Sequence, residues 1–409
     1  MKSMIALILS LVLHVTPGES VGAAVDSART VYEARGEKTT ILIEPGTYCE
    51  ELTIDVPGLT LKNASKHPSI GLKNHGVDAD SEAVRLTWYY GHGYQYRSMG
   101  SRVNYGGSRE RLWNASVLVT APDFRAEGII FENSFNLYVC EKEAADSLVD
   151  ISHNTSLPSP PRGEAPSPWR VKGSARLDVQ WTSIEPLGVR SERPKKIMPV
   201  RPREVGSTEV QKKRYRERAS AISFAKGATN AVLKNCRAVG RQDVLYGDEG
   251  ATIYWQGGVL QGGVDFIFGG MTMVADHTTI IANITDEKGE KCYIAAGRAE
   301  PGSRGLLFYK CYIRSPRPER VWLARPWRSW GETVWAYTRW EKGKKILNPE
   351  VWSTGLIRKR EEFNPDDPCP RSYEYKSQDK SKNRPAWVTI LSKPQLPDGT
   401  KLTPKAWLK

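Results

Sequence analysis

Two aspartates between Arg241 and Gly270 are the residues best suited to chemistry. Asp243 lies in the sequence Asp-Val-Leu-Tyr and Asp265 in Val-Asp-Phe-Ile-Phe, so each adjoins a short apolar, strand-like run. They are 22 positions apart (243 to 265). In a parallel β-helix one coil takes about 20 residues, and neighbouring coils lie about 4.8 Å apart. In such a fold the two carboxyl groups would stack about 5 Å apart.

Two carboxyl groups this close have different pKa values, because ionisation of one disfavours ionisation of the other. One can then act as an acid while the other acts as a nucleophile or base. Gln242, beside Asp243, offers an amide donor, and Arg325 follows the short apolar run that ends at Ala324. An arginine holds a carboxylate ionised through two parallel hydrogen bonds. The alternative is that each Asp only caps a turn, which is a common role of this residue.

The sequence around the aspartates repeats with a period close to one coil. Three segments align with one another: Ala221–Arg237, Val244–Leu260 and Phe266–Ile280. In this alignment Asn235, Gly257 and His277 occupy the same position. Self-similarity at a fixed period is typical of a solenoid. Later runs continue the pattern: Leu306–Ile313, Val321–Leu323 and Thr333–Tyr337.

The first part of the chain predicts a helix followed by short strands. Ala23–Arg35 has helical spacing of small and apolar residues, and Thr39–Ile43 is typical of a strand. Glu44–Tyr48 favours a turn before a strand at Glu51–Ile54, and Leu59–Leu61 favours another strand. Short strands separated by Gly, Pro and Asn indicate an all-β protein.

Three segments depart from this pattern. Residues 63–112 are irregular and rich in aromatic residues, and we expect a long excursion from one coil. Residues 141–218 are rich in Pro and Ser and then in Lys and Arg, so we expect a surface insertion without its own core. Its basic run at Lys212–Arg216 is either solvated or in contact with a polyanion. After residue 345 we expect a tail anchored by aromatic residues: Trp352, Tyr373, Tyr375 and Trp387.

The composition is that of a soluble globular protein with a positive field. Charged residues make up 26% and hydrophobic residues 39% of the 409 residues. The chain has 59 Lys and Arg against 46 Asp and Glu, a net charge of +13. Such a field favours nucleic acid, an anionic membrane or an acidic polysaccharide. No zinc finger, helix-turn-helix or RNP pattern is present, which disfavours nucleic acid as the partner.

The N-terminus has the pattern of a secretory signal peptide. Lys2 precedes the apolar run Ile5–Val15, and small residues follow Pro17. The run is too short to span a bilayer, and no other stretch approaches 18 apolar residues. We therefore expect residues 1–20 to be a leader, and the protein to be secreted and without a membrane span. The alternative is that the run forms a buried first helix.

Six cysteines in an exported chain allow up to three disulfides, in any of 15 pairings. None has CxxC or Cys/His ligand spacing, which disfavours a zinc site. Cys292 and Cys311 are about one coil apart and either bond to each other or remain buried thiols.

Four motifs, in order, resemble those of the pectin methylesterase (pectinesterase) family. Gln242–Tyr246 is similar to QDTLY, Val264–Gly269 matches VDFIFG, Leu323–Trp327 resembles LGRPW, and Gly46–Glu50 resembles an early GxYxE signature. The similarity extends from about Ala23 to Leu391. It implies a single-stranded right-handed parallel β-helix with a short N-terminal helix and long loop excursions. We assign this domain to residues 23–393, with the insertion at 141–218 and a tail at 394–409.

The resemblance also implies hydrolysis of the methyl esters of galacturonate in pectin, giving pectate and methanol. Asp265 would be the nucleophile that forms an acyl-enzyme, and Asp243 would protonate the departing methanol and then activate water. Gln242 would donate to the oxyanion and Arg325 would orient Asp265. Three aromatic residues would line the sugar subsites: Tyr246, Phe268 and Trp327. No metal or organic cofactor is implied, and we expect a monomer with pectin as its partner.

The chain departs from the family pattern in three places. Many members carry a second oxyanion Gln in a QAVAL segment; the matching stretch here is Arg218–Ile222, with Ala219 where Gln is expected. We therefore expect one donor to be missing or supplied from elsewhere. Ala324 replaces the Gly of LGRPW. The strand that usually precedes the first helix is nearly absent, so we expect an incomplete first coil.

Other functions remain open on the sequence alone. Carboxylates about 5 Å apart also suit a retaining glycosidase, and Gly91-His92-Gly93 matches a tripeptide of polygalacturonases, although the paired-Asp motifs that accompany it there are absent. A pectate lyase requires clustered acidic Ca²⁺ ligands, which the central motif lacks. A non-catalytic polysaccharide-binding β-helix, or an esterase acting on another ester such as a thioester, is a further alternative.

Overall fold

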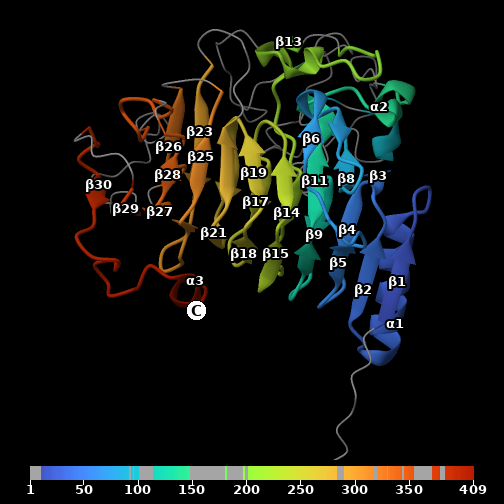
Figure 1. The fold of residues 1–409 in the computed structure, drawn as a ribbon, viewed down its shortest axis with the longest axis horizontal. Coiled ribbons are helices and arrows are strands. Elements are labelled where there is room, and N and C mark those ends of the chain that lie inside the picture. The colour runs from blue at the N-terminus through green and yellow to red at the C-terminus, as the bar shows by residue number, and fades with distance from the viewer. Residues whose placement is uncertain are drawn as a thin grey trace, which may run out of the picture.

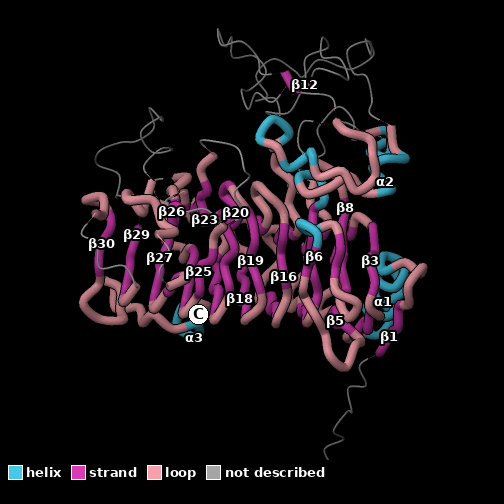
Figure 2. Tube along the Cα trace, turned by 45° about the horizontal axis from the view of Figure 1, so that its top comes forward, coloured by secondary structure: helices cyan, strands magenta, loops and turns pink. Residues whose placement is uncertain are grey.

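The computed structural model describes most of the chain as a stack of coils. It describes residues 11–91, 94, 96–100, 114–147, 180–181, 197–198, 201–282, 290–316, 320–328, 330–342, 345–353, 371–377 and 383–409. Successive coils follow one another from the N-terminal end to the C-terminal end of the stack, as the colours of Figure 1 show. The strands of neighbouring coils lie side by side as long parallel sheets (Figure 2).

Three parallel sheets form the walls of the stack. Sheet 1 has 11 strands, in the order β1 (Leu11–Val15), β2 (Thr39–Ile43), β5 (Thr60–Asn63), β10 (Arg125–Glu127), β15 (Ala231–Lys234), β18 (Thr252–Gln256), β21 (Thr272–Asp276), β24 (Leu306–Tyr309), β27 (Glu332–Ala336), β29 (Arg371–Tyr375) and β30 (Val388–Ile390). Sheet 2 has 8 strands, in the order β3 (Gly46–Cys49), β8 (Val84–Trp88), β11 (Ile129–Asn133), β16 (Arg237–Val239), β19 (Val259–Gly262), β22 (Thr279–Ala282), β25 (Tyr312–Arg314) and β28 (Arg339–Trp340). Sheet 3 has 7 strands, in the order β4 (Leu52–Ile54), β9 (Val117–Val119), β14 (Ile222–Phe224), β17 (Leu245–Gly247), β20 (Val264–Gly269), β23 (Cys292–Gly297) and β26 (Val321–Ala324).

The remaining described elements are short. Two antiparallel pairs lie outside the three sheets: β6 (Leu72–Lys73) with β7 (Asp78–Ala79), and β12 (Gln180–Trp181) with β13 (Ile197–Met198). The helices are α1 (Val21–Arg35), α2 (Glu141–Ala145) and α3 (Pro404–Trp407), with 3₁₀ turns at Asn74–Gly76, Ser134–Asn136, Glu209–Gln211 and Lys213–Tyr215. None of the described helices has the length and apolar character that crossing a membrane requires.

The period predicted from the sequence is confirmed. The backbone N–H of Asn235 donates to the carbonyl of Gln256 on the next coil, and that of Gly257 donates to Asp276 one coil further. Asn235, Gly257 and His277 all have left-handed backbone, with φ of 48°, 67° and 49°. Each coil therefore makes the same bend at the same place.

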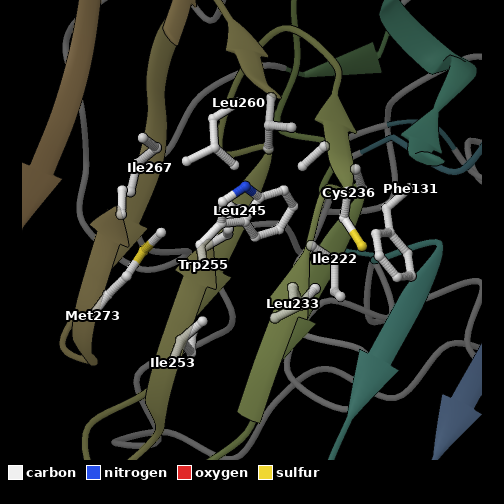
Figure 3. Close-up of a cluster of buried hydrophobic side chains, with 14 of the residues drawn as sticks. Phe131, Ile222, Leu233, Cys236, Leu245, Ile253, Trp255, Leu260, Ile267 and Met273 are labelled. Carbon is white, nitrogen blue, oxygen red and sulfur yellow. The ribbon is translucent and has the colours of Figure 1, made fainter. Parts of the chain in front are cut away.

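Apolar side chains fill the inside of the coils. Figure 3 shows Trp255 of β18 facing Leu245 of β17 and Leu260 of β19, one from each sheet, and all three are at most 1% exposed. Phe308 and Trp335 stack in the same interior with ring centroids 3.8 Å apart. Full burial of one such side chain contributes about 1.5–3 kcal/mol. The strands of sheet 3 from β14 to β26 are buried along their whole length, so the site is built on a sheet covered on both faces.

The N-terminal part differs from the expectation of an incomplete first coil. Leu11–Val15 forms β1, which pairs with all of β2, and Val15 is 2% exposed. That expectation was wrong, and the predicted leader overlaps a strand of the fold; its cleavage stays a prediction. Helix α1 begins after Ser20, whose hydroxyl accepts from the N–H of Ala23. The turn expected at Glu44–Tyr48 is wrong in part, because Gly46–Cys49 is strand β3.

The expected excursion at residues 63–112 was also wrong in part. Val84–Trp88 is strand β8, paired with β3 and β11. The aromatic residues that follow it are buried on the outside of sheet 2 in a second apolar cluster, which we call the aromatic cluster: Tyr89, Tyr90, Tyr94, Tyr96, Met99, Ile130, Phe135, Leu137, Tyr138, Cys140, Ala83, Ala219 and Val239. These side chains bury one another and together cover the outer face of sheet 2.

The two ends of the 141–218 segment pack against this aromatic cluster. Glu143 of α2 and Arg201 form a buried ion pair at 2.8 Å, and the Tyr96 hydroxyl donates to the same carboxylate. The Arg201 guanidinium lies 3.8 Å from the centroid of the Phe135 ring. Most of residues 148–200, including the Pro-rich run, lie outside the described residues.

The C-terminal region continues the coils instead of forming only a tail. Strands β29 and β30 extend sheet 1 beyond β27. Of the predicted anchors, Trp352 and Tyr375 are 1% and 6% exposed. Helix α3 packs beside β21 and β24, and the indole N–H of Trp407 donates to the carbonyl of Gly305 at 3.1 Å.

Candidate active site

Asp243 and Asp265 occupy equivalent places on neighbouring coils. Strands β17 and β20 pair with Tyr246 level with Phe268, and a bridge joins Gln242 to Val264. The same register places Asp243 beside Asp265, so the stacking predicted from their spacing is confirmed. Both side chains are buried, since both residues are 3% exposed.

Both aspartates have left-handed backbone, with φ of 55° at Asp243 and 47° at Asp265. This conformation is uncommon outside glycine, and Asp is among the residues that tolerate it. The surroundings hold it: the N–H of Asp243 donates to the carbonyl of Val264, and the Ser220 hydroxyl donates to the carbonyl of Asp243. The pairing of β20 with β23 is irregular between Val264 and Ile267, on either side of Asp265. Such irregularities re-aim a side chain away from the regular alternation.

Arg325 clamps Asp265. Its Nε donates to Oδ1 at 2.6 Å and its Nη2 donates to Oδ2, which is the paired geometry expected from the sequence. The guanidinium lies 4.0 Å from the centroid of the Tyr293 ring, and the backbone N–H of Arg325 donates to the carbonyl of Ala295. The clamp places a positive charge against the Asp265 carboxylate and fixes its orientation.

Asp243 is in a different electrostatic setting. Burial, with a smaller effect of the neighbouring Asp265 charge, raises the pKa of Asp243 to about 7. Arg218, Arg325 and a hydrogen bond from the Gln242 side chain lower this pKa without reversing the shift. Asp243 is therefore protonated below about pH 7, while its neighbour is paired with an arginine. One carboxyl is set up as a proton donor and the other as an anion.

Arg218, not Ala219, is the residue of its stretch that faces the pair. Ala219 is 1% exposed within the aromatic cluster, and its backbone N–H donates to the carbonyl of Gln242. The Nε of Arg218 lies 3.7 Å from Oδ2 of Asp243. Ala219 has no side-chain donor, so of the two alternatives the structure favours a donor supplied from elsewhere, by the neighbouring residue. The position beside Asp243 holds a cation with several N–H donors.

The three predicted aromatic residues come together next to the aspartates. The rings of Tyr246 and Phe268 have centroids 5.3 Å apart, and those of Phe268 and Trp327 are 5.4 Å apart. Arg298, which the sequence analysis missed, lies 5.6 Å and 5.8 Å from the Tyr246 and Phe268 centroids. It donates to the Tyr246 hydroxyl at 2.9 Å and pairs with Glu249 at 3.0 Å. The aromatic patch therefore carries a cation at its edge.

Arg241 links the site to the end of the 141–218 segment. Arg241, next to Gln242, forms hydrogen bonds of 2.8 and 2.9 Å with the two oxygens of Glu290. Its other terminal nitrogen donates to the carbonyls of Gln211 and Lys212. The segment is thus fixed to the backbone that carries Asp243.

Within the described ranges, no group of three His, Cys, Asp or Glu side chains is arranged to hold a metal ion. Gln242, Asp243, Asp265 and Arg325 all lie in or directly beside strands of sheet 3. The described fold and side chains thus define a parallel β-helix protein with a buried pair of unlike aspartates and an adjacent aromatic patch.

Residues 209–362 match the pectinesterase family. The resemblance to this family is therefore confirmed, and three of its four motifs, all but Gly46–Glu50, lie within the matched residues. A pectinesterase of Petunia integrifolia is 29% identical over 147 residues, which is 34% of this chain and 38% of that protein. Pectinesterase 4 of Arabidopsis thaliana is 36% identical over 142 residues, or 32% of this chain and 23% of its own length. The matches thus span less than two fifths of these relatives.

Solved structures share the fold along nearly the whole chain. A pectin methylesterase from carrot has a TM-score of 0.57 at 16% identity and covers 100% of this chain and 95% of its own. One from Erwinia chrysanthemi has a TM-score of 0.56 at 18% identity, covering 94% of both chains. The predicted right-handed parallel β-helix with a short N-terminal helix is thereby confirmed.

Proposed function

We propose that this protein hydrolyses the methyl esters of galacturonate in pectin, releasing methanol and leaving pectate. The observation that carries the proposal is the stacked pair of aspartates in unlike settings: Asp265 is clamped by Arg325, and Asp243 has a pKa raised to about 7. Ester hydrolysis by covalent catalysis needs this combination of an anionic nucleophile and a neutral acid. The pectinesterase match supports the choice of ester.

In the first step the Asp265 carboxylate attacks the ester carbonyl carbon. The Gln242 amide donates to the oxyanion that forms, and the Arg218 cation beside Asp243 adds positive potential there. Asp243 gives its proton to the methoxy oxygen as the bond to the carbonyl carbon breaks, so methanol leaves. The product of this step is an anhydride between Asp265 and the galacturonate carboxyl group.

In the second step Asp243, now ionised, takes a proton from a water molecule that attacks the galacturonate carbon of the anhydride. The bond to Asp265 breaks, galacturonic acid leaves and gives its carboxyl proton to solvent, and Asp265 returns to its arginine-clamped state. Asp243 ends protonated, as it began. Both aspartates return to their starting states, and water is the only other reactant in these two steps.

The substrate class follows from the surroundings of the pair. Trp327, which is only partly buried against the buried rings of Tyr246 and Phe268, offers an apolar ring face to a sugar ring. The chain's net charge of +13 attracts an acidic polysaccharide. A solved pectin methylesterase of the same fold carries a bound hexasaccharide. We further propose that the protein acts outside the cell that makes it, as the leader-like N-terminus predicts.

Incubation with highly methylated pectin tests the proposal when methanol and new reducing ends are followed separately. We expect methanol without new reducing ends. Reducing ends alone would mean a glycosidase and would overturn the proposal. Pectin binding without either product would mean a binding protein.

Removing the charge of Arg218 should move the pH dependence. Because Arg218 lowers the pKa of Asp243, Arg218→Met is expected to raise it further. The loss of activity on the alkaline side should then begin at higher pH than in the unaltered protein, with a lower maximal rate. Arg214→Met is the control, because Arg214 lies in the same segment but pairs with Glu209 at the surface. An unchanged alkaline limb in Arg218→Met would remove Arg218 from the site.

Truncating the aromatic patch should weaken binding more than catalysis. Trp327→Ala is expected to raise KM for pectin about 2–10-fold, the usual effect of losing one ring contact, with a smaller change in kcat. Tyr312→Ala is the matched control, because Tyr312 is 40% exposed on sheet 2. Equal KM values for both variants would mean that the sugar chain binds elsewhere.

A further inference from the structure

Two cysteines meet where the first coil and the 141–218 segment come together. Cys49 ends strand β3 of sheet 2, and Cys140 is the residue that caps α2. Cys49 packs against the aromatic cluster that contains Cys140, and their thiols hydrogen bond to each other. Nothing in the fold or in the proposed reaction uses this pair.

Contacts on both sides hold the two thiols together. The Nζ of Lys142, in the first turn of α2, donates to the carbonyl of Cys49 at 2.6 Å. The backbone N–H of Glu50 donates to the carbonyl of Thr87 on the next coil, which fixes the end of β3. The N–H of Glu143 donates to Sγ of Cys140 at 3.4 Å. These contacts hold the end of β3 and the start of α2, which carry the two cysteines, beside each other.

The electrostatic settings of the two thiols differ. The hydrogen bond from Cys49 lowers the pKa of Cys140, and the Glu143 N–H adds to this effect against the opposing effect of burial. The pKa of Cys49 is raised by the same hydrogen bond and by burial. Cys140 therefore carries the thiolate at a lower pH than an ordinary cysteine and is the better nucleophile of the two.

The other described cysteines have no such partner. Cys236, Cys292 and Cys311 are at most 1% exposed, and their thiols donate to backbone carbonyls within the coils. All five described cysteines are free thiols, and Cys292 and Cys311, considered as a pair from their spacing, are the buried thiols of the two alternatives. Cys369 lies outside the described residues.

We propose that Cys49 and Cys140 are a disulfide site, whose closure by a small disulfide oxidant such as glutathione disulfide ties the first coil to the base of the 141–218 segment. The Cys140 thiolate attacks one sulfur of glutathione disulfide, forming a mixed disulfide and releasing one glutathione thiolate. The Cys49 thiol loses its proton and attacks the Cys140 sulfur, releasing the second glutathione. Two protein thiols are oxidised and one glutathione disulfide is reduced to two glutathione molecules. The site does not depend on the proposed esterase activity.

Peptide mapping of the full chain tests the proposal directly. The protein is equilibrated in buffers of defined glutathione to glutathione disulfide ratio, its free thiols are alkylated under denaturing conditions, and it is digested with trypsin without reduction. We expect the peptides 39–62 and 126–142 to appear as one cross-linked species, two hydrogens lighter than their sum, in the oxidising buffers. Cys236, Cys292 and Cys311 should be alkylated throughout. Recovery of Cys49 and Cys140 as alkylated thiols at every ratio, or of either one bonded to a different cysteine, would overturn the proposal.

Thermal unfolding gives a second measurement. A disulfide that closes a long loop stabilises mainly by restricting the unfolded chain. Reduction should therefore lower the unfolding midpoint of the unaltered protein and, equally, that of Cys311→Ala, which is the control with a buried free thiol. Cys49→Ala and Cys140→Ala should show no such dependence on reduction. A reduction-dependent shift that persists in both variants would contradict the assigned pairing.

Discussion

Asp265→Asn is expected to abolish methanol release from pectin, by about 10⁴–10⁶-fold, the usual effect of removing a covalent nucleophile. The amide cannot attack the ester carbonyl. It also cannot accept both N–H groups of Arg325, so the cation that orients the nucleophile loses its partner. Asn tolerates the left-handed backbone of Asp265 as well as Asp does, so the coil itself should be unaffected.

Methanol assays on pectin, together with circular dichroism and thermal unfolding, measure this effect. Asp123→Asn is the matched control, because Asp123 is another aspartate with left-handed backbone, at φ 61°. Its carboxylate accepts a hydrogen bond from the side chain of Asn230, away from Asp243 and Asp265. We expect a folded, inactive Asp265 variant and an active Asp123 variant. Turnover close to normal in Asp265→Asn would remove Asp265 as the nucleophile.

Asp243→Asn is expected to abolish turnover and, at neutral pH, to raise stability. The loss of turnover follows because neither the departing methoxy group nor the attacking water has a proton partner. The change in stability follows from the pKa of Asp243, which is about 7 in the folded protein against an ordinary value of 3.8. Between these values the folded state holds a proton that the unfolded state releases, so the free energy of unfolding falls as pH rises. Above about pH 7 the ionised side chain costs a few kcal/mol.

Unfolding of both proteins at a series of pH values measures this cost. The unaltered protein should lose stability relative to Asp243→Asn as pH rises from about 4 to 7, and the difference should then level off. Below pH 4 the two should be similar, because Asp243 is protonated in both states. An Asp243→Asn variant that is less stable than the unaltered protein at pH 8 would contradict the raised pKa.

Much of the site could be predicted because the fold repeats. Once the period is known, the interval from Asp243 to Asp265 fixes their stacking, since equivalent residues of successive coils lie side by side. The position of Arg325 near Asp265 could be predicted in the same way, because Arg325 follows β26, and β26 and β20 both pair with β23. In this fold the length of the sequence repeat thus determines which residues of neighbouring coils are in contact.

The errors arose where spacing alone could not give orientation. Arg218 and Ala219 are adjacent, and only the pairing of Ile222 with Leu245 shows that Ala219 is level with Gln242. Residues 216–220, which precede β14, have no regular secondary structure, so their side chains do not follow the alternation of a strand. The stretch Arg218–Ile222 is too short for an alternation of polar and apolar residues to show which side chain faces Asp243.

The N-terminal strand was missed for a different reason. An apolar run of this length suits a signal peptide, a buried helix or a buried strand, and Leu11–Val15 has no alternation that separates them. Its role depends on β2, which lies beyond α1 in the sequence and supplies all of its partners. The aromatic residues within 63–112 were recognised, but their packing was not predicted, because their partners come from the turn after β11 and from residues next to β14.

The central claim is that Asp265 forms an acyl-enzyme that Asp243 resolves. Incubating Asp243→Asn with a nitrophenyl ester of an oligogalacturonide tests it most directly, because nitrophenol leaves without a proton from Asp243 whereas water still needs the missing base. We predict one equivalent of nitrophenol per protein molecule, and an acyl group found by mass spectrometry on Asp265. Continued turnover, no adduct, or an adduct on another residue would contradict the account.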